Sequence, residues 1–195
     1  MSVSQLWLPI LVSAVVVFVA SSLAWMVLPH HKADIKKLPD EKAWFEQLGQ
    51  ANLAAGTYMW PNAATPAEGK TEEFRARYAA GPWGSVNIQT GQPNFGRNLL
   101  LVFLIYGVIG TLVAYLTGRA HGAGAGFGAV FPVATAAAIL GYCIGSLPGA
   151  IFMAKPARFV FTDFVDALAY AVLTGIVFAA LWPSAAKAAT SGVGQ

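Results

Sequence analysis

The chain has few charged residues and one cysteine. Only 11% of its 195 residues are Asp, Glu, Lys or Arg, whereas 56% are hydrophobic. Soluble domains average about 25% charged residues, so an ordinary soluble domain is excluded. The lone Cys143 excludes an intramolecular disulfide. The net charge is +3 and basic residues alternate with acidic ones, so we expect no nucleic-acid partner.

Motifs of common enzymes are also missing. The sequence has no HExxH, no CxxC and no Ser/His/Asp arrangement typical of catalysis. The glycine-rich stretch 122–128 lacks the preceding strand, the spacing and the lysine of a nucleotide-binding loop, and it is interpreted as a flexible connection. We therefore expect no catalytic residues, no cofactor and no enzymatic activity.

Four long apolar runs dominate what is present. Residues 6–28, 99–117 and 127–147 contain no charge, and residues 159–182 contain two aspartates. Each run reaches the roughly 20 residues that cross a bilayer as a helix. The sequence predicts an all-α membrane protein with four transmembrane helices. The first run is not expected to be a cleaved signal peptide, because no positive charge precedes it and it is long for one.

One polar loop separates the first two runs. We divide the chain into a first helix at 1–29, a loop at 30–97, three helices within 98–183 and a flexible tail at 184–195. The loop carries eight of the 12 basic and seven of the nine acidic residues. Helix-start patterns at 40 and 71, and strand-like segments at 57–60 and 85–89, predict a small α+β-like region.

The basic residues predict an orientation. With four spans, the loop 30–97 and the connection 148–158 share one side, which holds ten of the 12 basic residues. The positive-inside rule then predicts a cytoplasmic loop and periplasmic termini.

Two helices carry small residues at intervals of four. Such faces let helix backbones approach closely in lipid. We expect these faces to meet inside the bundle; they comprise Gly110, Ala114 and Gly118 on one helix and Gly141, Gly145 and Gly149 on the next.

The last span carries a polar stripe. Asp163, Asp166, Tyr170 and Thr174 follow the spacing of one helical face. Ionisable groups in a span usually face the bundle or a watery cavity, so the stripe is expected to face inward. The two aspartates form either a proton or cation site, or a structural pair near the helix start with Arg97 or Arg158 as partner.

His30, His31 and Asp34 follow the first span directly. They could ligate a metal, but adjacent histidine side chains are expected to point in different directions. We interpret them as an interfacial, protonatable pair and predict no metal site.

The loop is rich in aromatic residues. These rings are expected to bury against one another and the bilayer surface, or to form a protein interface. The candidates for a partner surface are Trp44, Phe45, Tyr58, Trp60 and Trp83.

Several stretches together resemble a family of four-helix bacterial inner-membrane proteins that has no assigned activity. The resemblance is carried by LPHHK at 28–32, LPDE at 38–41, TYMWP at 57–61 and LWP at 181–183. It implies a bacterial inner membrane. We expect a non-enzymatic accessory or scaffold subunit that contacts the bilayer and other membrane subunits. The alternative is a small transporter or channel that uses the polar stripe.

Overall fold

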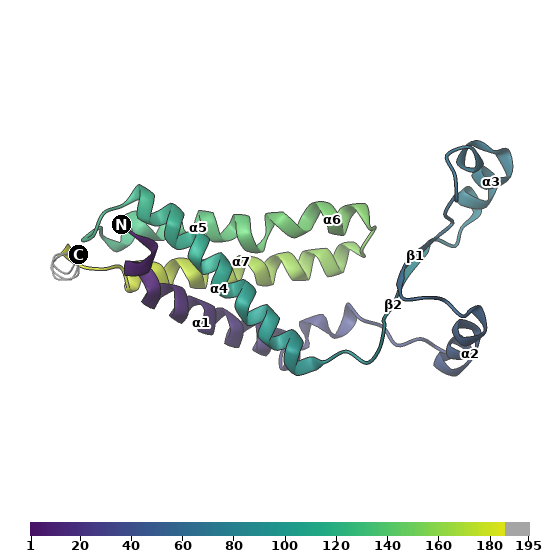
Figure 1. Cartoon of the computed structure of the whole chain (residues 1–195), viewed down its shortest axis with the longest axis horizontal. Helices are drawn as coiled ribbons and strands as arrows, with labels where there is room; N and C mark the ends of the chain where they lie inside the picture. The colour runs from purple at the N-terminus through teal and green to yellow at the C-terminus, as the bar shows by residue number, and fades with distance from the viewer. Residues whose placement is uncertain (186–195) are drawn as a thin grey trace. The chain divides into compact units, whose positions relative to one another are not determined.

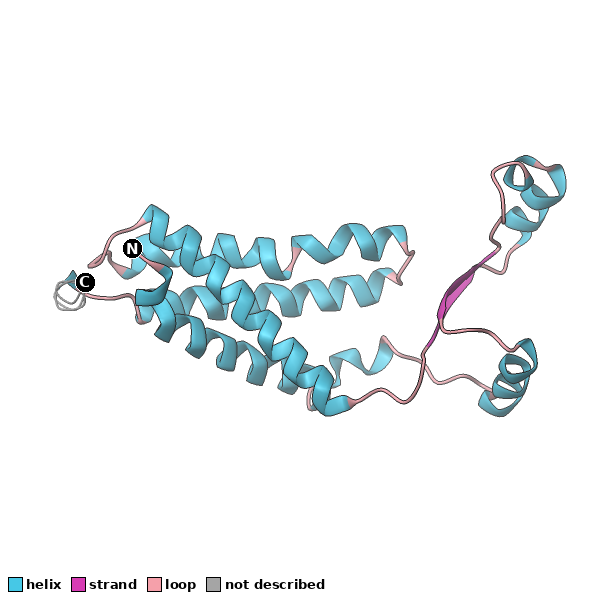
Figure 2. Cartoon of the chain, viewed as in Figure 1, coloured by secondary structure: helices cyan, strands magenta, loops and turns pink. Residues whose placement is uncertain are grey.

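A computed structural model describes residues 1–185; most of the expected tail at 184–195 lies outside the described residues. The chain forms two compact units (Figure 1). The first contains residues 1–36 and 96 onward, and the second contains residues 37–95. The first unit is helical throughout, and the sheet lies in the second (Figure 2).

The first unit contains the four expected spans. The first span is α1 (Trp7–Met26), preceded by the 3₁₀ helix η1 (Val3–Leu6), and the second is α4 (Phe95–Ala120). The third begins with α5 (Phe127–Tyr142), and the fourth is α7 (Ala157–Ala180). All four stretches are long and apolar enough to cross a bilayer, with mean hydropathies from 1.7 to 2.5. The chain is therefore a multi-pass membrane protein, as predicted.

The third span is interrupted, which the sequence prediction of one helix over 127–147 did not include. After α5, the chain passes through the 3₁₀ helix η4 (Ile144–Ser146) into the short helix α6 (Leu147–Phe152). Pro148 explains the position of the break, because a proline ring clashes with the carbonyl four residues earlier in an α-helix. The helical path then continues to Phe152, beyond the predicted end.

Helix α7 is the centre of the bundle. It lies against α5 and also against α1 (Figure 1). An apolar core fills the end of the bundle that holds the start of the chain, and its buried members include Leu6, Val113, Val130 and Phe178. Trp182 belongs to this core and donates a hydrogen bond from Nε1 to the carbonyl oxygen of Gly122, 2.9 Å away.

The expectation that the two small-residue faces meet was wrong. Gly110 and Gly118 of α4 face the start of the chain instead: a Cβ on Gly110 would lie 3.3 Å from Ser13 Oγ, and one on Gly118 would lie 3.3 Å from Leu6 Cδ1. Ala114 is fully buried in the apolar core. Only Gly141 contacts α4, through Ile109. Gly145 lies within η4 and Gly149 lies within α6, so neither belongs to the face of α5.

The closest glycine contact joins α5 to α7, and it yields a prediction. A Cβ on Gly175 would overlap Thr135 Oγ1 and would lie 3.3 Å from Phe131 Cδ2. Overpacking of this kind costs typically about 1–3 kcal/mol, so Gly175→Ala is expected to lower the unfolding temperature in detergent. Gly107→Ala is the matched control, because no described atom outside the neighbouring backbone of its own helix lies within 4 Å of its Cβ position. Equal effects of the two variants would contradict the packing described here.

The second unit combines two helices with a two-stranded sheet. Helix α2 (Glu41–Ala51) begins at Asp40, whose side chain accepts a hydrogen bond from the Ala43 amide, and α3 (Glu72–Ala80) begins in the same way at Thr71. Strands β1 (Gly56–Trp60) and β2 (Gly84–Ile88) pair antiparallel, with Tyr58 opposite Val86. The two helix starts and the two strands are as the sequence predicts.

The aromatic rings of this unit do not bury one another, contrary to expectation. All of residues 37–95 are described, and none of them is buried. Phe45 and Trp83 are about three-fifths exposed, at 61% and 62%, and Trp60 is also exposed, whereas Trp44 and Tyr58 are half-buried. Trp83 donates from Nε1 to the Tyr78 carbonyl, so its ring is held in place while its face stays open.

Candidate functional site

The site begins in the segment that leaves α1. Leu28 is extended, and Pro29 then starts the 3₁₀ helix η2 (Pro29–Ala33), which ends at Asp34. Proline suits a first helical position because its missing N–H has no partner there. In a 3₁₀ helix, residues three apart lie on the same side, so His31 and Asp34 are neighbours.

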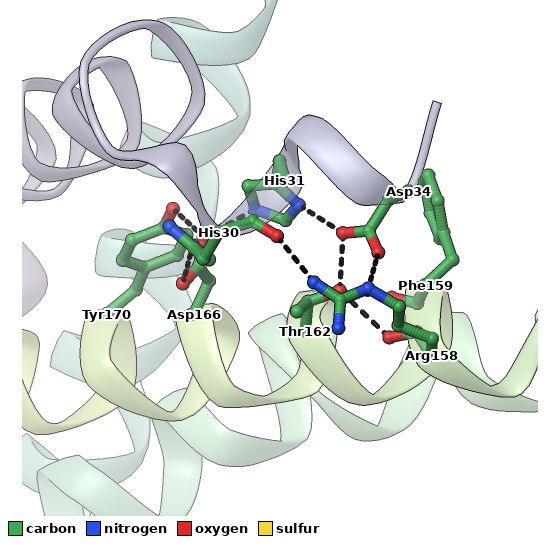
Figure 3. A network of polar contacts seen from close by, with 8 residues as sticks. All are labelled: His30, His31, Asp34, Arg158, Phe159, Thr162, Asp166 and Tyr170. Carbon is green, nitrogen blue, oxygen red and sulfur yellow. Dashed lines mark hydrogen bonds and ion pairs between the residues drawn. The ribbon is translucent and has the colours of Figure 1, made fainter. Parts of the chain in front are cut away.

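Helix α7 provides the other half of the site. Arg158, Thr162, Asp166 and Tyr170 recur at intervals of four, and this spacing aligns them along one face of the helix. Figure 3 shows these side chains turned toward η2. The two halves are far apart in the sequence and are joined by hydrogen bonds and ion pairs.

Asp166 accepts hydrogen bonds from three side chains. Nε2 of His30 lies 3.0 Å from Oδ1, and Nε2 of His31 lies 2.9 Å from Oδ2. The Tyr170 hydroxyl donates to Oδ2 over 3.3 Å. Asp166 is only 8% exposed, so these donors compensate for its removal from water.

Asp34 also has three partners. Nδ1 of His31 lies 2.9 Å from its Oδ2, and the Thr162 hydroxyl donates to the same oxygen over 2.7 Å. The Nε of Arg158 forms an ion pair with Oδ1 at 3.0 Å. Arg158 also donates to the backbone carbonyl of His30. Asp34 therefore ties η2 to the first turns of α7.

His31 bridges the two carboxylates, one through each ring nitrogen. Burial alone would lower the pKa of His31, but the hydrogen bonds to Asp166 and Asp34 outweigh it, so the pKa lies above its ordinary value. The pKa of Asp34 is lowered, chiefly by the Thr162 hydrogen bond and also by His31 and Arg158. With His31 doubly protonated, Asp34 and Asp166 are balanced by His31 and Arg158, and the four charges sum to zero.

Aromatic rings hold the His31 ring in place. Trp25, in the last turn of α1, stacks on it with ring centroids 3.9 Å apart and an angle of 9° between planes. Trp25 also contacts Phe159 of α7. Stacking on a large ring restricts the imidazole, so both of its nitrogens remain directed at their carboxylate partners.

The polar side chains of α7 continue from Asp166 into the bundle as far as Thr174. The centroid of the Tyr170 ring lies 6.4 Å from that of Tyr106 in α4 and 6.2 Å from that of Tyr142 in α5. Thr174 is fully buried one turn further along α7. Beyond these residues, the apolar core around Val113 and Phe178 fills the bundle.

The inward orientation predicted for the polar stripe is confirmed for Asp166, Tyr170 and Thr174, which are all buried. Asp163 is half-buried and lies one turn before Asp166. Of the two arginines suggested as partners, Arg158 instead pairs with Asp34. Arg97 lies in the first turn of α4, and its pairing with Asp163 or Asp166 stays a prediction.

The role of the two histidines was missed. They were expected to point in different directions, but the Nε2 atoms of both face Asp166. Two signals in the sequence could have suggested this. Pro29 favours a helical turn that gathers the following side chains, and the four-residue spacing on α7 extends from Asp166 back to Arg158.

Comparison with protein-family models, with curated proteins and with solved structures found no match to this chain.

Proposed function

We propose that the chain is a non-enzymatic accessory subunit of a membrane complex, which holds the unit 37–95 at the membrane for a partner protein. The observation that carries the proposal is the surface of this unit. It has no buried residue, yet it exposes Phe45, Trp60, Tyr78 and Trp83. Exposed aromatic side chains are typical of protein interfaces, where burial against a partner contributes the stability that such a unit lacks alone.

The polar network supports this role. It fixes η2 to α7 directly before the chain enters the second unit at Lys37. Every titratable side chain of the network has a partner. With His31 doubly protonated, the charges of His31 and Arg158 balance those of Asp34 and Asp166. Such an arrangement suits a fixed attachment point on the bundle, because a cluster of ion pairs and hydrogen bonds in a low dielectric resists rearrangement.

The proposed location is a bacterial inner membrane, with the unit 37–95 in the cytoplasm and the chain termini in the periplasm. The excess of basic residues at 30–97 and 148–158 supports it. We expect Lys70→Cys, in a Cys143→Ser background, to resist a membrane-impermeant thiol reagent in intact cells. Ser2→Cys is the control and should react. Labelling of position 70 from outside would contradict the orientation.

A photoreactive amino acid placed at Trp83 tests the accessory function. Trp83 is well exposed, so the probe should crosslink whatever covers this face in native membranes. The expected product is a discrete complex with one other protein. Crosslinking to lipid alone would show that the aromatic residues anchor the unit to the bilayer, and would contradict the proposal.

A small transporter or channel is the second candidate, and buried Asp166 with its two histidines favours it. Charged side chains deep in a span often mark ion pathways. If this candidate holds, vesicles with the purified protein should dissipate a proton or cation gradient, and Asp166→Asn should abolish the flux while Asp163→Asn reduces it less. The apolar core beyond Thr174 argues against an open path through the bundle.

A further inference from the structure

Three potential metal ligands converge at the end of α1. The Nε2 atoms of His30 and His31 and a carboxylate oxygen of Asp166 all lie within 4.8 Å of one another (Figure 3). The two nitrogens approach opposite oxygens of the same carboxylate, at 3.0 and 2.9 Å. In a tetrahedral zinc site with bonds near 2.0–2.2 Å, ligand atoms stand about 3.4 Å apart. Small side-chain shifts would therefore make room for an ion.

The hydrogen bond of the other ring nitrogen of His31, Nδ1, is an independent reason to infer a metal site. Metal-binding histidines usually donate their other ring N–H to a carboxylate, which orients the ring and directs the lone pair of the second nitrogen at the metal. His31 Nδ1 has this partner, because it lies 2.9 Å from Oδ2 of Asp34. Asp34 is in turn held by Thr162 and Arg158, and its side chain is fully buried. Trp25 fixes the plane of the imidazole.

We propose that His30, His31 and Asp166 form a binding site for a divalent transition-metal ion, with Asp34 as the positioning residue for His31. Two imidazole nitrogens and one carboxylate oxygen suit zinc and its first-row neighbours, whereas magnesium and calcium prefer oxygen ligands. On binding, doubly protonated His31 loses its Nε2 proton to solvent and keeps the Nδ1–H that Asp34 accepts, whereas neutral His30 carries its one N–H on Nδ1, so both Nε2 lone pairs are free for the metal. Three protein ligands leave one tetrahedral position open for water or another ligand.

An ion can reach the site past the His30 side chain. The His30 side chain is 31% exposed, whereas the His31 side chain is 5% exposed and that of Asp166 is 11% exposed. The site is thus open on one side and enclosed on the others. This inference does not depend on the accessory function, because the ligands all lie within the four-helix unit.

The test uses the full-length protein in detergent, purified with a tag that contains no histidine and stripped with a chelator. Titration with Zn²⁺ followed by calorimetry is expected to give about one ion per chain, and Co²⁺ should give the visible absorption bands of a tetrahedral site. Binding should also change the fluorescence of Trp25, which stacks on His31.

Variants distinguish this site from adventitious binding. His30→Gln and Asp166→Asn should each weaken Zn²⁺ binding by at least about 100-fold, because loss of even an outer partner costs 10–100-fold. Asp34→Asn should weaken binding by about 10–100-fold while leaving the Co²⁺ bands in place, which marks a positioning role. The matched controls are His121→Gln and Asp163→Asn, and both should bind as the unchanged chain does.

Three outcomes would overturn the proposal. The first is a stripped protein that binds no Zn²⁺ and gives no Co²⁺ absorption bands. The second is a His121→Gln variant whose Zn²⁺ binding is weakened as much as that of His30→Gln. The third is a His30→Gln variant that binds Zn²⁺ as the unchanged chain does. Size-exclusion profiles and circular dichroism establish that each variant is folded. If Asp166→Asn fails to fold, His30→Gln decides, because its partly exposed side chain can change without leaving a buried charge.

Discussion

Replacing Asp166 with alanine is expected to lower the free energy of unfolding of the bundle by about 3–5 kcal/mol, the usual cost of removing one partner from a buried ion pair. The carboxylate accepts hydrogen bonds from His30, His31 and Tyr170. Its loss leaves two buried donors, the His31 imidazole and the Tyr170 hydroxyl, without this acceptor. For a chain of this length, the change corresponds to a fall of roughly 6–20 °C in the unfolding temperature.

Asp163→Ala is the matched control for this prediction. Asp163 is also an aspartate in the first half of α7, but it is only half-buried, and Asp166 rather than Asp163 accepts the histidine hydrogen bonds. Thermal unfolding in the same detergent should therefore show a much smaller change. A fall in the Asp163 variant equal to that of the Asp166 variant would mean that the network around His31 does not stabilise the bundle.

The second large effect is the loss of the proposed partner protein when exposed aromatic side chains of the unit 37–95 are replaced. Phe45→Ser and Trp83→Ser together are expected to reduce recovery of the partner protein from solubilised membranes by at least about 30-fold, because interface aromatics are typical hot spots worth 2 kcal/mol or more. Both rings are mostly exposed, so the substitutions remove contact area without opening a cavity. Quantitative mass spectrometry of the captured material measures the loss.

Leu38→Ser controls for a general loss of exposed apolar surface. Leu38 belongs to the same unit and is exposed, but it is not one of the aromatic side chains. Its variant should retain the partner. Full retention by the aromatic double variant, with normal amounts of the chain in the membrane, would show that Phe45 and Trp83 do not carry the interaction.

Much of the fold was predictable because its signals are local. A charge-free run of sufficient length predicts a membrane-spanning helix, and Asp40 and Thr71 predict the starts of α2 and α3 through hydrogen bonds to nearby amides. The break before Pro148 was missed because residues 148–158 were predicted to be a connection that lies outside the third span. Helix-to-helix packing was not predictable, because small residues at intervals of four show which face is close-packed but not which helix it meets.

The candidate site was only half predictable for the same reason. The inward face of α7 follows from the spacing of its polar residues, whereas the two histidine partners of Asp166 lie 135 and 136 residues earlier in the chain. No local pattern joins positions so far apart. The turn at Pro29 adds a further difficulty, because the direction of the His30 and His31 rings depends on how η2 packs against α7.

Native mass spectrometry of the chain, extracted in mild detergent from its own membranes, tests the accessory function most directly. The chain has a mass of 20.5 kDa. The account predicts a complex whose mass is that of this chain plus a different protein in fixed proportion, and it predicts loss of that complex in the Phe45→Ser/Trp83→Ser variant. A species at 20.5 kDa or at whole multiples of it, with no other protein bound, would contradict the account.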